Sequence, residues 1–300
     1  MKKLDAATLY HRVEERAAAN LAEGNIGGAS VGVWQAGAEV FRAHFGTRSP
    51  DTDEPLAEGA IFRLASMTKP ITAAAILLLE DRGLLSIDDP VCRYLPAFSE
   101  PYMLNESGER VAVKVPITVR HLLSHTSGYG WAAESGKLAA DMTEHERTEV
   151  RPHADFFARV PLSFAPGARQ EYSATVAFSI LTAVAEQVTG MDFADLLQKE
   201  IFDPCGMTDT TFSPTEEQWA RMVGMHNKKD GCAVQSSFHP GDGETRTHDL
   251  LNAIQALSQL SYAPMQMRPL RLAPDNEYIC LIVKNQVLIT SSDSPVISAG

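Results

Sequence analysis

The sequence predicts a mixed α/β fold, in which an antiparallel sheet flanked by helices is joined to a helical region. Three patterns in the 300-residue chain predict this class. An amphipathic helical pattern over residues 4–23 is followed by a hairpin pattern over residues 29–46. A long apolar helix is expected from about residue 66 to residue 82. From about residue 84 to residue 212 the pattern predicts helices separated by proline-containing joints.

Each element has a signal at its boundary. The first helix is expected to end at Gly24, because the glycines that follow tolerate left-handed backbone. Small, branched and aromatic residues flank Ala36-Gly37-Ala38, which predicts the hairpin turn. A short buried strand is expected over Ile61–Ala65, and Gly83 is expected to close the long helix after it. Helices of the helical region are expected at residues 118–123, 152–160, 174–189 and 192–201.

Composition and charge exclude several classes of protein. The chain is 44% hydrophobic, enough to bury a core, and carries 26 basic against 38 acidic side chains, a net charge of −12. This charge repels nucleic acids and anionic membranes, so we expect neither as a partner. The N-terminus lacks the apolar core of a signal peptide, no apolar run is long enough to cross a membrane, and the four cysteines show no metal-ligand spacing. We expect a cytoplasmic protein with free thiols.

The chemistry is predicted to centre on Ser66-Met67-Thr68-Lys69, an S-x-x-K pattern where a strand gives way to a helix. Residues three apart on a helix are neighbours, so Lys69 can reach the Ser66 hydroxyl. A serine needs a base to become a good nucleophile, and burial against the following apolar run would lower the pKa of the lysine toward that role. The N–H groups at the helix start, that of Ser66 included, point toward an oxyanion.

For an isolated S-x-x-K, the better explanation is a helix cap with an exposed lysine. Further motifs in this chain favour the catalytic interpretation. They are, in order, FRLASMTKPITA at 62–73, LLSIDDPV at 84–91, ITVRHLLSHTSG at 117–128, FAPG at 164–167, EYS at 171–173 and IFDPCGM at 201–207. Together they strongly resemble the serine β-lactamase-like family, which includes class C β-lactamases, D-alanyl-D-alanine carboxypeptidases and family VIII esterases. The resemblance implies a β-lactamase/transpeptidase-like fold, with Ser66 as nucleophile and Lys69 as base.

The family's second motif, Y-x-N, aligns on Tyr172-Ser173-Ala174. The resemblance implies that Tyr172 completes the proton relay, the alternative being a buried tyrosine with a satisfied hydroxyl. Ala174 departs from the family, whose asparagine contacts the amide side chain of β-lactams and peptides. Its absence favours an ester substrate.

Two other patterns resemble catalytic motifs. Gly28-Ala29-Ser30-Val31-Gly32 matches the G-x-S-x-G nucleophile elbow, but the surrounding residues predict a continuous strand, so Ser30 is expected to be structural. Ser124 and His125 are adjacent, and adjacent residues do not pair well as nucleophile and base. We expect His125 to satisfy backbone groups in a turn.

The resemblance is expected to end near Met225. Residues 1–225 are predicted to form the β-lactamase-like hydrolase domain, with its helical region at about 84–212, and residues 226–300 a non-family tail. The family's third motif, a K-T-G, H-G-G or W-G-G triplet, is not found, and residues 243–257 resemble peptides read from non-coding DNA. The fold is therefore expected to be incomplete at its C-terminus, with a hairpin of residues 277–282 and 286–290 partly covering the exposed sheet edge.

The predicted function is hydrolysis of a small-molecule carboxylic ester through an acyl-enzyme on Ser66, with Lys69 and Tyr172 moving the proton. No metal or organic cofactor is required. The alternatives are a β-lactamase or D,D-carboxypeptidase acting on β-lactam-like substrates, and a truncated member of the family without turnover.

Overall fold

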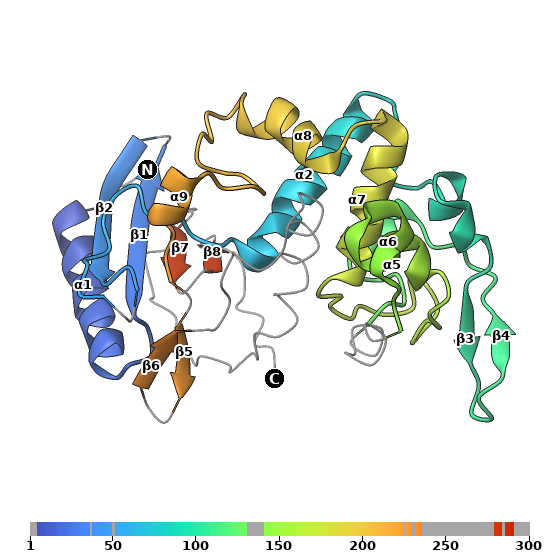
Figure 1. The fold of residues 1–300 in the computed structure, drawn as a ribbon, viewed down its shortest axis with the longest axis horizontal. Coiled ribbons are helices and arrows are strands. Elements are labelled where there is room, and N and C mark those ends of the chain that lie inside the picture. Colours follow the sequence, from blue (N-terminus) through green and yellow to red (C-terminus); the bar gives the residue numbers. More distant parts are fainter. Residues whose placement is uncertain are drawn as a thin grey trace. The chain divides into compact units, whose positions relative to one another are not determined.

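The computed structural model describes residues 5–36, 38–49, 52–130 and 141–224, and the backbone of four strands between residues 226 and 290 (Figure 1). The chain divides into two compact units. One, here the sheet unit, takes its described residues from Met1–Leu64, Pro214–Pro240 and Ala263–Gly300. The other, the helical unit, is described over parts of Ala65–Ser213. The predicted change from family to non-family sequence near residue 225 stays a prediction.

The sheet unit is built on a four-stranded antiparallel sheet of order β2-β1-β7-β8. Its elements are α1 (Ala6–Ala22), β1 (Gly28–Gln35), β2 (Ala38–Gly46), α9 (Glu216–Ala220), β5 (His226–Lys229), β6 (Cys232–Gln235), β7 (Ile279–Val283) and β8 (Gln286–Thr290). In β1, alternate residues Ala29, Val31 and Val33 are buried, as expected for a strand with one face toward a core. Helix α1 packs against β2, where the Tyr10 ring meets Phe41 edge-on with centroids 6.1 Å apart.

The C-terminal hairpin expected from the sequence is present as β7 and β8, and β7 pairs with β1 through Ala29 opposite Val283. It therefore covers the edge of β1 as predicted. Residues 243–257, which resemble non-coding translation, lie outside the described residues.

The helical unit is organised around helix α7 (Val176–Thr189), in which every residue from Val176 to Ala185 is buried. Helices α2 and α6 pack against it (Figure 1). Helix α3 also packs against it. The described elements of this unit are η1 (Ala65–Met67), α2 (Thr68–Asp81), η2 (Val91–Arg93), η3 (Pro96–Ser99), β3 (Tyr102–Leu104), β4 (Arg110–Ala112), α3 (Val119–Leu123), α5 (Glu144–Thr148), α6 (Val150–Phe157), α7, α8 (Phe193–Leu197) and the π-helical turn η5 (Gln198–Phe202). A helix apolar on all sides is stable only when neighbours cover it, which is why α7 forms the centre.

Most predicted helices are confirmed, with boundaries shifted by up to three residues. Thr118 caps α3 through a capping box, and Gly190 ends α7 in the left-handed conformation expected of a C-terminal glycine. Helix α6 begins before Pro152, which the first helical turn tolerates. The last predicted helix is interrupted, since α8 gives way to the π turn η5.

The strand predicted over Ile61–Ala65 is wrong. Only Ile61 makes a β-bridge, to Met222, and Ala65 has a φ of +51°. A left-handed residue cannot continue a strand, so the chain turns at Ala65 into η1. The helix predicted from Ser66 consequently begins at Thr68.

Candidate active site

Ser66 lies in the 3₁₀ turn η1, directly before helix α2. The residue before it, Ala65, holds a left-handed backbone that a non-glycine residue adopts at a cost of about 1 kcal/mol. Strained backbone of this kind concentrates at functional sites, because the surrounding structure must hold it in place. The turn fixes the Ser66 hydroxyl at the start of α2, as the S-x-x-K pattern predicts.

The structure brings the three predicted site residues together. Lys69 Nζ donates to Ser66 Oγ at 3.3 Å, and Ser66 Oγ is hydrogen-bonded to the Tyr172 hydroxyl at 2.9 Å. Lys69 reaches Ser66 from the next turn of the helix, whereas Tyr172 comes from a segment 106 residues further along the chain. All three belong to the helical unit.

Lys69 is buried, with 8% of its surface exposed. Its Nζ lies 5.3 Å from the centre of the Tyr172 ring and 5.5 Å from that of Phe178. Burial disfavours the charged ammonium, while the two ring faces attract it. Phe178 was not predicted from the sequence, because nothing in its helical pattern distinguishes a ring facing a lysine from a core residue.

Tyr172 is held in the loop that leads into α7. The next residue, Ser173, is fully buried, and its Oγ accepts from Ala177 N at 3.0 Å. Ser173 thereby satisfies an N–H group in the first turn of α7, whose N-cap residue is Thr175, and its side chain is held in place. Ala174, at the family's asparagine position, is 5% exposed and offers only a methyl group.

His125 lies beside Tyr172. Its Nδ1 accepts from the backbone N–H of Ser173 at 3.1 Å, so it satisfies a backbone group as expected. Ser124, its neighbour, donates to Arg120 O at 2.8 Å and lies at the exposed end of α3.

Ser30, the other predicted non-catalytic serine, sits in the middle of strand β1. Its Oγ is hydrogen-bonded to Nδ1 of His44 on β2 at 2.8 Å, a cross-strand pair. The strand continues through Val31 and Gly32 without the strand-to-helix turn that a nucleophile elbow requires.

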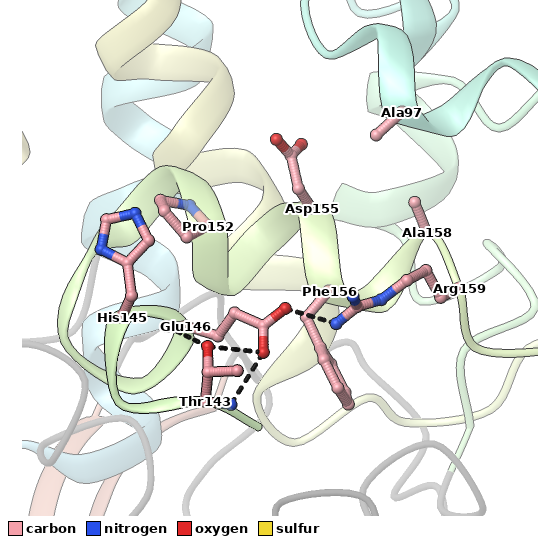
Figure 2. Close-up of a pocket in the computed structure, with 9 residues that line it drawn as sticks. All are labelled: Ala97, Thr143, His145, Glu146, Pro152, Asp155, Phe156, Ala158 and Arg159. Carbon is pink, nitrogen blue, oxygen red and sulfur yellow. Dashed lines mark hydrogen bonds and ion pairs between the residues drawn. The ribbon is translucent and has the colours of Figure 1, made fainter. Parts of the chain in front are cut away.

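A separate cavity of about 490 Å³ lies in the helical unit (Figure 2). Its lining is Ala97, Thr143, His145, Glu146, Pro152, Asp155, Phe156, Ala158 and Arg159, and includes none of the three site residues. Glu146 accepts from Thr143 N and Oγ1 at 2.8 and 2.9 Å and from Arg159, and these donors, the Thr143 amide first, lower its pKa (Figure 2). Glu146, one of the two carboxylates that line this cavity, is thus engaged in capping α5.

In the described part of the chain, no three His, Cys, Asp or Glu side chains gather in a way that would hold a metal ion. Cys92 and Cys205 are free thiols. Among the described helices, none has the length and apolar character needed to cross a bilayer.

A family model described as Beta-lactamase matches residues 13–272. The chain belongs to the Beta-lactamase family. The predicted family is therefore confirmed. The match extends past residue 225, where we expected the resemblance to end.

Two curated relatives of this chain carry different names. Esterase EstB of Burkholderia gladioli is 36% identical over 225 residues, which cover 72% of this chain and 54% of EstB. Penicillin-binding protein 4* of Bacillus subtilis (strain 168) is 34% identical over 181 residues, 58% of this chain and 36% of that protein. The chain thus spans about half or less of the length of these relatives. The family and its relatives support a hydrolase.

Among solved structures, the fold resembles that of EstCE1, described as a hydrolase with promiscuous acyltransferase activity. The TM-score is 0.66 at 24% identity, over 79% of this chain and 63% of EstCE1. The predicted β-lactamase/transpeptidase-like fold class is confirmed.

Proposed function

We propose that this chain hydrolyses small-molecule carboxylic esters through an acyl-enzyme on Ser66, with Lys69 as general base and Tyr172 as proton relay. The observation that carries the proposal is the pair of contacts from Lys69 Nζ to Ser66 Oγ, 3.3 Å, and from Ser66 Oγ to Tyr172 OH, 2.9 Å. A nucleophile within hydrogen-bonding reach of its base is the arrangement that nucleophilic catalysis requires.

The geometry supports a two-step reaction. Ser66 Oγ attacks the ester carbonyl, and its proton passes to the neutral Lys69 amine, directly or through the Tyr172 hydroxyl. As the ester C–O bond breaks, the same proton is transferred to the departing alcohol oxygen. The alcohol is released, and the acyl group stays bound to Ser66 Oγ. Water then attacks the acyl carbon, while Lys69 and Tyr172 accept a proton from the water. As the bond between Ser66 Oγ and the acyl carbon breaks, that proton passes to Oγ and the acid is released. The backbone N–H of Ser66, at the start of α2, supports the oxyanion.

Two observations favour an ester over an amide. Ala174 leaves the family's asparagine position with a buried methyl group, which cannot contact a substrate amide. EstB, which is 36% identical, is named an esterase. The second candidate is a β-lactamase or D,D-carboxypeptidase, favoured by the similarity to penicillin-binding protein 4*. Faster hydrolysis of a chromogenic cephalosporin than of a short acyl ester would reverse this order.

The alternative from another class is a family member without turnover. Its support is that we did not find the third motif in the sequence. That motif would supply the second oxyanion N–H. We propose a small-molecule partner in either enzymatic case, since a net charge of −12 repels nucleic acids and anionic surfaces.

The intact mass of the protein after treatment with a fluorophosphonate tests the proposal. We expect one adduct in the wild type and in Ser30→Ala, and none in Ser66→Ala. Ser30 is a suitable control because it is also a half-buried serine bonded to a basic side chain. Well-folded wild-type protein without an adduct would support the non-catalytic alternative.

A further inference from the structure

The segment that carries Tyr172 is gripped on both sides by one residue, His125. Glu171 N donates to the His125 carbonyl at 3.0 Å, and Ser173 N donates to His125 Nδ1 at 3.1 Å. The two donors are the residues directly before and after Tyr172. One hydrogen bond to the main chain and one to the side chain of His125 therefore hold the backbone on both sides of Tyr172. These two bonds are called the clamp.

The His125 ring also packs on the relay itself. Its centroid lies 4.7 Å from that of Tyr172, with the rings tilted by 41°, and 5.5 Å from that of Phe178. Phe178 and Tyr172 are the two rings that face Lys69 Nζ. The imidazole thus supports the aromatic wall against which both proton-carrying groups rest.

His125 is itself rigidly placed. Its backbone is left-handed, with a φ of +56°, a region that histidine and asparagine adopt more often than most other non-glycine residues. The backbone N–H of His125 donates to Leu122 O at 3.3 Å. The backbone of the following residue, Thr126, donates through its N–H to His121 O at 2.8 Å and accepts through its carbonyl from Gly167 N at 2.8 Å. These bonds tie the turn to helix α3, which packs against α7.

From these contacts we infer that His125 is a positioning residue for the reaction, which sets the place of the Tyr172 hydroxyl relative to Ser66. The inference rests on the proposed function. Because Nδ1 accepts a backbone N–H, the ring acts in its neutral form with the proton on Nε2. It moves no proton in the reaction. The functional partner of His125 is Tyr172, which is distant in sequence, and not its sequence neighbour Ser124.

A pair of amide substitutions separates this role from general support. The Oδ1 atom of asparagine reaches the place of Nδ1, and asparagine also accepts left-handed backbone well, whereas the Oε1 atom of glutamine reaches the place of Nε2. Both variants lose the ring. We expect kcat of His125→Asn to stay within about fivefold of wild type and kcat of His125→Gln to fall about 100-fold, the scale that misplacement of a reacting group produces, with KM changed less than about threefold. His145→Gln, an exposed histidine on α5, is the matched control and should match wild type.

A second measurement tests whether the effect acts through the relay. In a Tyr172→Phe background the hydroxyl to be positioned is absent, so Asn and Gln at position 125 should differ less than about twofold in kcat. Equal activity of the two variants in the wild-type background would overturn the inference. So would a difference of the same size with and without the Tyr172 hydroxyl, because that is the result of a merely structural residue.

Hydrogen exchange of the Ser173 amide distinguishes the failure of this inference from failure of the proposed function. We expect exchange at least about tenfold faster in His125→Gln than in wild type and in His125→Asn, because only glutamine removes the acceptor. A wild type without a Ser66 adduct would refute the proposed function while this contrast still upheld the clamp. Equal exchange in all three proteins would refute the clamp whether or not the wild type reacts.

Discussion

At the scale of residues, the proposed relay depends on three groups whose roles differ. Ser66 supplies the attacking oxygen, and Lys69, buried beside two rings, supplies the base. Tyr172 adds a hydroxyl, 2.9 Å from Ser66 Oγ. Removal of that single oxygen therefore tests the relay with the smallest change in packing.

We expect Tyr172→Phe to lower kcat by about 10²–10⁴-fold, the range for loss of a positioned acid–base group. Thermal unfolding should change little, since the ring and its contacts remain. Tyr129→Phe is the matched control: Tyr129 is a buried tyrosine whose hydroxyl donates to Phe157 O at 2.9 Å, and its loss should cost about 1 kcal/mol of stability without lowering kcat. Steady-state kinetics on a p-nitrophenyl ester and a thermal melt check both variants. Equal kcat values for wild type and Tyr172→Phe would remove Tyr172 from the relay.

The sequence was sufficient for some of these residues and not for others. The contact between Ser66 and Lys69 follows from helical spacing, which is local. Tyr172 was found only through a family motif, because no periodicity links residues 106 positions apart. The role inferred for His125 was missed, since it depends on where the α3 turn lies against the loop before α7.

At the scale of elements, the junction of α7 and α8 carries a partly buried acid. Glu186 on α7 accepts from Phe193 N at the start of α8, 3.0 Å away. Burial, first, and then the nearby carboxylates of Asp192 and Glu149 raise the pKa of Glu186 to about 7, against a donated hydrogen bond that lowers it. The protonated form is thus the one that the fold favours.

This junction predicts a pH dependence of stability. The stabilisation from Glu186 is fully present below its unfolded pKa of 4.5 and is lost as the pH rises through about 7. Glu186→Gln keeps an acceptor for Phe193 and removes the ionisation. Between pH 5 and pH 8 the variant should lose about 1 kcal/mol less unfolding free energy than wild type, a value reduced for screening because Glu186 is only partly buried. Urea unfolding at both pH values measures it, and parallel losses in the two proteins would show that Glu186 ionises freely.

Long apolar elements were the best predicted from sequence. The patterns of α2 and α7 extend over several turns, and Gly83 and Gly190 mark their ends with positive φ. The prediction of a strand over Ile61–Ala65 was wrong because a short apolar run does not distinguish a strand from another buried segment. Tertiary structure instead places a left-handed Ala65 there, which aims Ser66.

At the scale of the whole molecule, the described residues of the proposed relay and its clamp all belong to the helical unit. The sheet unit provides a four-stranded antiparallel sheet, including the late strands β7 and β8. Propensity alone predicted their hairpin, but its pairing with β1 joins residues about 250 positions apart and is a property of the folded sheet.

The net charge of the whole chain predicts that the reaction with charged esters depends on salt concentration. A net charge of −12 produces a field that repels anionic substrates over about 10 Å at 0.1 M salt. β-Lactams carry a carboxylate and many simple esters are neutral, so the field favours the ester, in the same direction as Ala174 does. We expect kcat/KM for an ester with a carboxylate in its acyl chain to rise about three- to tenfold between 10 and 300 mM salt, on the order of the steering effects of such fields, and that for a neutral ester to stay within about twofold. A cationic ester of the same length should show the opposite slope. If all three slopes are equal, substrate selection lies in local contacts around Ser66, and the overall charge contributes nothing to it.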